Sequence, residues 1–133
     1  MNIQTAVLCD AATEYGGKLN LLGAFDAIHA QQLPVSHPQC AIALRMTFTD
    51  AEEGSHTLRL TFMDEDGQSI MRGIDVPVTV AIPAEAHFAT SNIIVNIQQL
   101  KFDRPGLYSV DIAMDGKQEG SIPLFVQVVP LQA

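Results

Sequence analysis

The chain of 133 residues has the length of one domain and can bury a single hydrophobic core without disulfide or metal cross-links, so we expect one domain over residues 1–133. With 47% hydrophobic and 17% charged residues, its composition is that of a packed protein and not of a disordered one. The net charge of -8 and the seven scattered Lys and Arg residues argue against nucleic-acid binding and against an anionic membrane surface.

The first residues, MNIQTAVLCD, lack the layout of an export signal, because no basic residue precedes a short apolar run. No window approaches the roughly 20 apolar residues of a membrane span. We therefore expect a cytoplasmic protein. In that compartment Cys9 and Cys40 are expected to be free, buried thiols and not a disulfide.

Alternation of apolar and polar residues dominates the chain and predicts β-strands, and no stretch of helical length keeps a 3.6-residue period. The expected strands cover residues 3–9, 18–30, 41–49, 56–63, 68–82, 90–98, 107–114 and 120–129. Two-residue turn signals stand at Asp66-Gly67 and Asp115-Gly116, and Gly16-Gly17 closes the first loop. Gly73 and Pro77 predict a bend or bulge inside the fifth strand.

Eight short strands with regular turns predict an all-β fold, an antiparallel two-sheet sandwich of immunoglobulin-like or C2-like topology. Tyr108 follows Pro105-Gly106 at the start of an alternating strand, which is where a tyrosine corner lies in immunoglobulin-like folds. Its hydroxyl would then return to the backbone near residues 101–104. The alternative is a tyrosine that packs on the core with its hydroxyl in water. Because the chain has no Trp, any likeness to antibody domains is architectural only.

Four strings of the sequence stand out beside this pattern: LCD at 8–10, GGKLNLLGAFD at 16–26, HPQCAIALRM at 37–46 and RPGLYSVDI at 104–112. They resemble a family of small, stand-alone bacterial proteins known only as a domain of unknown function. The resemblance spans essentially the whole chain, and the first two strings are its most specific part. It implies a bacterial β-sandwich and brings no activity, cofactor or catalytic residue with it.

Catalysis by a Cys–His pair requires a nucleophile and a base within hydrogen-bonding reach, usually with a third group that orients the base. The available groups are Cys9, Cys40, His29, His37, His56 and His87. No G-x-S-x-G motif or similar frame accompanies them. His37, close to Cys40 in the sequence, comes nearest to a pair, but a loop histidine beside a buried thiol is the simpler interpretation. A small hydrolase with Cys/His chemistry at a loop end is therefore kept only as the alternative to a non-enzyme.

Carboxylates gather in several of the expected loops. If consecutive strands alternate in direction, the loops at 10–17, 50–55, 83–87 and 115–116 share one end of the sandwich. That end then collects Asp10, Glu14, Asp50, Glu52, Glu53, Glu85 and Asp115, and the first five are the candidates for a cation site of C2-like type. A polar loop end that keeps the protein in solution is the favoured alternative, because no metal-ligand spacing is enforced. We therefore assign no metal or cofactor.

The strands at 41–49 and 56–63 would expose a Thr and Arg face if they paired as a hairpin. That face would hold Arg45, Thr47, Thr49, Thr57, Arg59 and Thr61, a patch suited to a carboxylate-bearing ligand or a partner protein. Ordinary sheet exterior is the favoured alternative, since threonine has a high β-propensity.

Two strands are apolar on both faces, as Ile93 with Ile94 and Leu124 with Phe125 show. A sandwich buries only one face of each strand, so the second face must be covered by a loop, by a segment of the same chain or by another subunit. A symmetric dimer is the commonest such solution, and we expect a homo-oligomer or a contact with another protein. The leading hypothesis is a non-catalytic binding or assembly module that acts through protein–protein contacts.

Residues 8–28, which hold the loop after the first expected strand and most of the second, contain polar residues whose roles can be predicted. Gly23, inside an expected strand, indicates a bulge or a point of close approach. Asn20 and Asp26 are expected to bond nearby backbone and fix how the first strands enter the sandwich. Asp10 would be the first carboxylate of the acidic end of the sandwich. Of the polar residues in this segment, it is the strongest candidate for a functional role.

Overall fold

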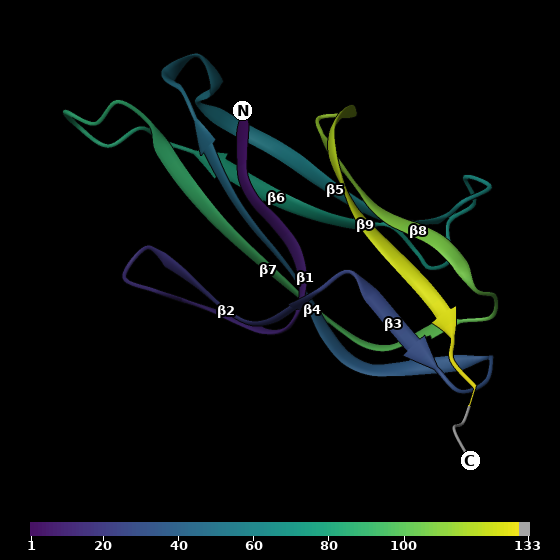
Figure 1. Ribbon diagram of the computed structural model, residues 1–133. Coiled ribbons are helices and arrows are strands. Elements are labelled where there is room, and N and C mark those ends of the chain that lie inside the picture. Colours follow the sequence, from purple (N-terminus) through teal and green to yellow (C-terminus); the bar gives the residue numbers. More distant parts are fainter. Residues whose placement is uncertain (131–133) are drawn as a thin grey trace.

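The structure is a computed structural model and describes residues 1–130, which form an all-β protein (Figure 1). Within this range nine strands make two sheets, and the one helical segment is a 3-10 turn, η1 (Asp50–Glu52). The same residues contain no helix with the length and hydropathy needed to cross a bilayer. The all-β prediction is therefore confirmed, with nine strands in place of the expected eight.

Sheet A has four strands in the order β2-β1-β4-β7, and every neighbouring pair is antiparallel. Its strands are β1 (Asn2–Tyr15), β2 (Lys18–Phe25), β4 (Val35–Phe48) and β7 (Ala89–Phe102). The expected strand at 3–9 thus continues to residue 15, so residues 10–15 are strand and not loop. After Cys9, β1 leaves β4 and pairs with β2 alone, which makes a two-stranded hairpin at the sheet edge.

Sheet B has five strands in the order β3-β9-β8-β5-β6. They are β3 (Ala27–Ala30), β5 (Gly54–Asp64), β6 (Ile74–Val80), β8 (Gly106–Met114) and β9 (Lys117–Val128). β3 runs parallel to β9, so the prediction of a purely antiparallel arrangement is wrong for this pair. The expected strand at 18–30 is split, because the chain crosses from sheet A to sheet B at Asp26, whose main-chain oxygen accepts a 2.9 Å hydrogen bond from the Phe125 N–H.

The expected Thr and Arg face does not form. β4 pairs with β1 and β7, whereas β5 pairs with β6 and β8, so the strands that would have made this face belong to different sheets. η1 links them, and Thr49 and Glu52 close the turn with a capping box. A connection of this kind moves the chain from one layer to the other instead of turning it back beside itself.

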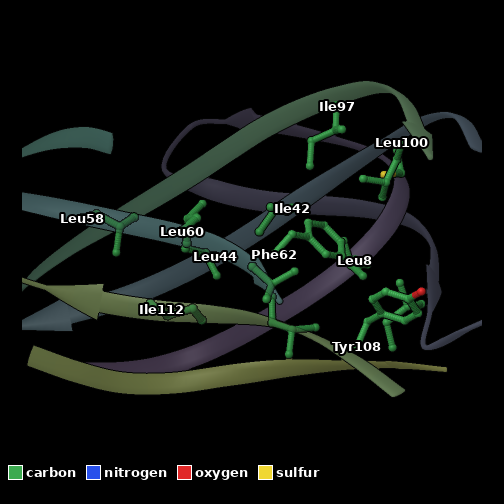
Figure 2. Close-up of a cluster of buried hydrophobic side chains, with 14 of the residues drawn as sticks. Leu8, Ile42, Leu44, Leu58, Leu60, Phe62, Ile97, Leu100, Tyr108 and Ile112 are labelled. Carbon is green, nitrogen blue, oxygen red and sulfur yellow. The ribbon is translucent and has the colours of Figure 1, made fainter. Parts of the chain in front are cut away.

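The main hydrophobic core lies between the two sheets (Figure 2), where side chains from β1, β4 and β7 meet side chains from β5, β8 and β9. Phe102 of β7 packs edge-on against Phe62 and Tyr108 of sheet B, with ring centroids 6.3 and 4.9 Å apart. The Tyr108 hydroxyl donates a 2.6 Å hydrogen bond to the main-chain oxygen of Arg104. The predicted tyrosine corner is thereby confirmed.

A second, smaller apolar cluster lies on the outer face of sheet A. Its fully buried members are Cys9, Ala41 and Ala43, and half-buried Val7, Ala12, Leu19 and Ile94 pack around them. Ala12 and Leu19 belong to the β1–β2 hairpin, so the second apolar face of β4 and β7 is covered by a segment of the same chain. Covering by a segment of the same chain was one of the three possibilities that the sequence allowed. For β7 the hairpin explains the second apolar face without a dimer contact.

Arg45 holds the tip of the hairpin against sheet A. Its Nη1 donates to the main-chain oxygen of Gly17 at 3.0 Å and to Asn92 Oδ1 at 2.9 Å, while its Nε donates to Gln4 Oε1 at 3.0 Å. The side-chain amide of Asn92 donates to the same Gly17 oxygen at 3.1 Å. One guanidinium therefore joins β1, β4, β7 and the hairpin tip over the small cluster.

Both cysteines are free and buried, as expected. Cys9 belongs to the small cluster and Cys40 to the main core, so the two thiols lie in different apolar surroundings. Each thiol can therefore report on the integrity of a different part of the fold.

Candidate functional site

A pocket of 380 Å³ opens where the chain passes from β2 to β3. Four strands contribute to its wall, which is lined by Asp10, Gly23, Ala24, Phe25, Ala27, Ile28, His29 and His37. Its volume falls within the range of about 300–1,000 Å³ that is usual for sites of small ligands or single side chains. One carboxylate, two imidazoles and an aromatic ring are thereby collected from segments that lie apart in the sequence.

Asp10 leans over Gly23, the residue opposite it on β2. Gly23 has φ +68°, and a Cβ added to it would overlap the Asp10 carboxylate and lie 2.8 Å from its Cγ. A side chain at this position would be strained by the backbone angle and would displace the carboxylate. Gly23 is therefore a point of close approach, as predicted, and what approaches it is Asp10.

The two histidines of the pocket are not paired with a nucleophile. His37 lies against Phe25, with ring centroids 5.4 Å apart, whereas Cys40 is completely buried in the main core. Burial, followed by the charges of Cys9 and Asp10, raises the pKa of the Cys40 thiol to about 11. Burial also raises the pKa of Cys9. Because the thiolate is the reactive form of cysteine, neither thiol is equipped for attack at neutral pH.

The hairpin next to this pocket exposes large apolar side chains. Tyr15 is 82% exposed, Leu22 is 72% exposed and Leu21 is 36% exposed. A shallow hollow of 230 Å³ runs along the hairpin and is lined by Ala11, Ala12, Thr13, Asn20, Leu21 and Leu22. We call these six residues with Tyr15 the hairpin surface. It borders the free edge of β2, the outermost strand of sheet A.

The five carboxylates proposed as a cation site do not come together. Asp10 and Glu14 lie on β1, whereas Asp50, Glu52 and Glu53 lie at the turn after β4. Cys9 pairs with Ala41, seven residues before the end of β4 at Phe48, which places Asp10 about 23 Å from that turn at 3.3 Å per residue. In the part of the chain that is described, no group of three or more His, Cys, Asp and Glu side chains is arranged to hold a metal ion.

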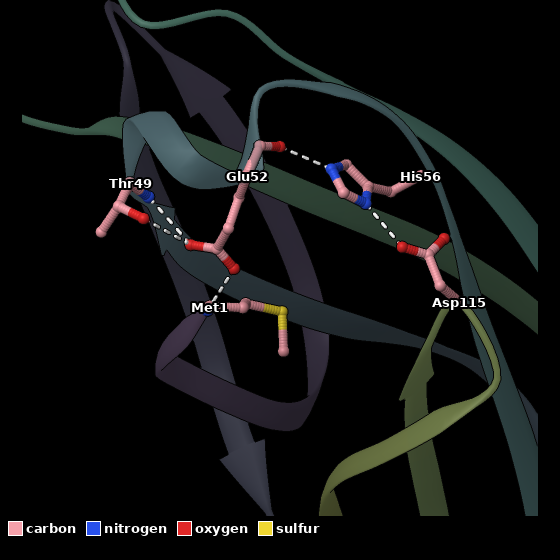
Figure 3. A network of polar contacts seen from close by, with 5 residues as sticks. All are labelled: Met1, Thr49, Glu52, His56 and Asp115. Carbon is pink, nitrogen blue, oxygen red and sulfur yellow. Dashed lines mark hydrogen bonds and ion pairs between the residues drawn. The ribbon is translucent and has the colours of Figure 1, made fainter.

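The loops at 50–55, 83–87 and 115–116 were expected at one end, and contacts connect their neighbourhoods. Glu53 Oε1 accepts a 3.0 Å hydrogen bond from the N–H of Ile82, which lies in the β6–β7 loop with Glu85 and His87. Glu52 accepts the ammonium of Met1 and a 2.9 Å hydrogen bond from the Thr49 N–H (Figure 3). These carboxylates are engaged by the protein itself.

His56 joins η1 to the β8–β9 hairpin (Figure 3). Its Nε2 lies 2.6 Å from the main-chain oxygen of Glu52, and its Nδ1 lies 2.6 Å from Asp115 Oδ2. Asp115 also accepts a 2.9 Å hydrogen bond from the Thr57 N–H. Because both ring nitrogens face oxygen acceptors, the protonated imidazolium fits this place best, and no ring nitrogen is left to act as a base. The pair is a structural clamp.

The clamp predicts a pH dependence of stability. The Asp115 hydrogen bond raises the pKa of His56 above 6.5, and the His56 hydrogen bond lowers the pKa of Asp115 below 3.8. The stabilisation from His56 is therefore complete below pH 6.5 and is lost as the pH rises through its raised pKa, and that from Asp115 is lost as the pH falls through its lowered pKa. Urea unfolding should show the largest stability difference between the wild type and His56→Gln at pH 4 to 6.5, and a shrinking one above pH 7. A difference that grows towards pH 9 would contradict this assignment.

The sequence interpretation missed the pocket. It named Asp10, His29 and His37 separately, and it placed Phe25 and His29 on one continuous strand. The one feature of the sequence that pointed to the pocket was Gly23, because a glycine inside an alternating strand indicates that another group approaches the backbone closely. It did not show which side chain would approach it.

The fold and the site together define a small two-sheet β-protein with an apolar hairpin surface beside a pocket that holds one carboxylate. The chain belongs to the family described as Family of unknown function (DUF6941), whose sequence profile matches residues 4–127. This confirms the resemblance seen in the sequence. A search of curated proteins finds no match.

Among solved structures, the chain is similar to part of the Pseudomonas fluorescens alkylpurine DNA glycosylase AlkC bound to DNA containing an abasic site analog. The match has a TM-score of 0.53 and 10% identity, and it covers 96% of this chain and 30% of that one. A β-glucosidase from Listeria innocua in complex with isofagomine matches with a TM-score of 0.46 and 12% identity over 80% of this chain and 15% of that one. At these identities the first likeness concerns the fold alone, and the second carries no argument.

Proposed function

We propose that this protein is a non-catalytic binding or assembly module that acts through protein–protein contacts. The observation that carries the proposal is the free edge of β2 beside the exposed side chains of Tyr15, Leu21 and Leu22. An edge strand presents unpaired N–H and C=O groups to which an extended segment of a partner can add as a further strand. Proteins usually protect such edges with charges or prolines, but β2 has a single charged residue, Lys18, and no proline.

We infer that the finer architecture is immunoglobulin-like. β4 and β7 lie in one sheet and β5, β8 and β9 in the other, an order that corresponds to strands B and E opposite C, F and G of that fold. The hydrogen bond of Tyr108 supports the same assignment. Modules of this architecture present edges and loops for contact with partners. The two free thiols support a reducing compartment such as the cytoplasm.

The partner is either a second copy of the chain or another protein. Leu107 and Phe125 pair across β8 and β9 and are 58% and 40% exposed on the outside of sheet B, which supports self-association through that face. The exposed hairpin surface beside the free edge of β2 supports contact with a different protein. The two cases differ in the mass of the particle in solution.

A selection from a displayed library of random twelve-residue peptides tests the module, with Leu21→Pro as the discriminating variant. In a two-residue hairpin the residues flanking the turn bond each other, so Lys18 faces β1 and the N–H of Leu21 faces the free edge. Proline at 21 removes that donor and leaves the bonds to β1 in place. We expect peptides to be enriched on the wild type and on Leu21→Thr, and to be lost on Leu21→Pro.

Light scattering on the same material separates the two partners. A mass of twice 14.4 kDa at micromolar concentration indicates a second copy, and a mass of 14.4 kDa with peptide enrichment indicates another protein. A monomer that enriches no peptide above a control protein of equal charge would overturn the proposed function.

A further inference from the structure

We propose that the edge of β2 accepts an extended segment of another protein that carries a lysine or arginine opposite Gly23, and that the carboxylate of Asp10 binds this basic side chain. The inference rests on the proposed function and names the chemistry of the partner. It follows from where Asp10 lies relative to the free edge.

Asp10 is one strand removed from the edge. Its neighbours in the chain pair with β2 as Cys9 with Ala24 and Ala11 with Leu22, so Asp10 stands opposite Gly23. In an ordinary sheet the side chain of the edge residue would lie between a carboxylate on the inner strand and a strand added at the edge. Gly23 has no side chain, and the Asp10 carboxylate lies where its Cβ would be. The carboxylate of Asp10, although it belongs to β1, therefore lies at the free edge of β2.

A segment added to β2 brings one residue opposite Gly23 on the same face of the sheet. The Cβ atoms of such directly opposite residues lie about 5 Å apart, so this residue of the segment would stand beside the carboxylate. A lysine or arginine there gains a charge-assisted hydrogen bond, whereas an aspartate or glutamate is repelled. Asp10 therefore discriminates among segments that would otherwise add to the edge equally well.

The surroundings of Asp10 suit a basic side chain. Within residues 1–130 its carboxylate makes no hydrogen bond or ion pair, so it needs no rearrangement to accept a cation. The adjoining ring of Phe25, which packs beside His37, offers an apolar contact to the hydrocarbon stem of lysine or arginine. The net charge of -8 attracts a cationic segment from a distance.

A second copy of this chain does not supply the required residue through its own β2. Residues of β2 that face the edge are Leu19, Leu21 and Gly23, and antiparallel edge-to-edge pairing sets such residues opposite one another. The one basic residue of β2, Lys18, faces β1 and so cannot stand opposite Gly23. Pairing of two β2 strands thus leaves the Asp10 carboxylate without a basic side chain. The occupant that we assign to this edge is another protein with a basic extended segment, and the mass of the particle in solution distinguishes it from a second copy.

The test uses three acetylated, fluorescein-labelled nine-residue peptides of alternating Thr and Val, with Lys, Gln or Glu at the fifth position. Fluorescence polarisation with the full chain should give about tenfold tighter binding of the Lys peptide than of the Gln peptide, and the weakest binding for the Glu peptide. In Asp10→Asn the preference for Lys should disappear while the affinity for the Gln peptide stays the same. Glu14→Gln is the matched control, since it removes one exposed carboxylate of β1 on the same face and should keep the preference.

The outcomes separate the inference from the function on which it rests. Equal binding of the Lys and Gln peptides to the wild type, or a preference that survives in Asp10→Asn, overturns the inference and leaves an unselective edge that binds peptides. Equal loss of the Lys preference in Glu14→Gln also overturns the inference, because the preference would then depend on the net negative charge of the protein and not on Asp10. Binding of none of the peptides, together with an empty library selection and a mass of 14.4 kDa in solution, overturns the proposed function as well.

Discussion

Replacing Phe102 by alanine is expected to lower the free energy of unfolding by about 3–5 kcal/mol, a large part of the 5–15 kcal/mol typical of a domain. The ring is 1% exposed and comes from β7 of sheet A. Its edge-on contacts are with Phe62 of β5 and Tyr108 of β8, both in sheet B. The substitution therefore leaves a cavity at a point where the two sheets meet, and neither sheet can close it without moving as a unit.

Urea unfolding followed by circular dichroism measures this effect. Phe88→Ala is the matched control, because Phe88 is 54% exposed and the same atoms are removed. Its free energy of unfolding should change by no more than about 0.5 kcal/mol. Similar losses in the two variants would show that Phe102 is not part of a packed core.

Replacing Arg45 by alanine is expected to expose Cys9 without exposing Cys40. The guanidinium holds the hairpin tip through Gly17 and Asn92, and the hairpin covers the cluster in which Cys9 is buried. A charge-assisted hydrogen bond contributes about 1.5 kcal/mol at the low end of its usual range. Losing one such bond makes opening of the hairpin away from sheet A roughly tenfold more frequent. Cys40 lies in the main core, which this opening does not reach.

Labelling with Ellman's reagent at pH 8 under native conditions tests this prediction, with the single-thiol variants Cys40→Ala and Cys9→Ala as backgrounds. The rate at Cys9 should rise about tenfold in Arg45→Ala, and the rate at Cys40 should stay the same. Arg59→Ala serves as the control, because the ion pair of Arg59 on β5 with Asp75 on β6 is exposed and belongs to sheet B. Equal acceleration of both thiols would mean global destabilisation and would contradict a role for Arg45 in docking the hairpin.

The parts of the fold that depend on local pattern could be predicted from the sequence. Period-two alternation identifies the strands, and turns such as Asp115-Gly116 are set by residues that are adjacent in the chain. The bond from Tyr108 to Arg104 spans four residues, so its motif is readable as well. Free, buried thiols at Cys9 and Cys40 were expected from the compartment, and both thiols are free and buried.

The parts that depend on distant partners could not be predicted. The break at Asp26 carries no glycine or proline signal, since it is made by pairing with Phe125, far along the chain. β4 and β5 are consecutive and strongly alternating, which favours a hairpin, yet η1 sends them to different layers. The expected cation site failed for a related reason, because β1 pairs antiparallel with β4. Asp10 therefore lies beyond Ala41 towards the start of β4, whereas the turn at Asp50 follows the end of β4.

The candidate site was partly visible in advance. Gly23 and Asp10 were each identified as positions with a special role, but their contact depends on the register of β1 with β2. The histidines were read as a possible partner of a thiol because His37 and Cys40 are close in sequence. Their actual surroundings follow from the passage of the chain between sheets, which places His29 and His37 in the lining of one pocket.

The parallel pairing of β3 with β9 has a consequence for synthesis on the ribosome. Ala27 pairs with Phe125, 98 positions later, so at 5–20 residues per second β3 emerges about 5–20 s before its partner. During that interval β3 has no strand beside it, and β8, once it is synthesised, lacks the neighbour that β9 later provides on its other side. A nascent chain stalled before Lys117 would thus present the unpaired edges of both β3 and β8. Synthesis of β9 covers these edges, so it is the step that prevents sheet B from pairing with nascent chains on the same mRNA.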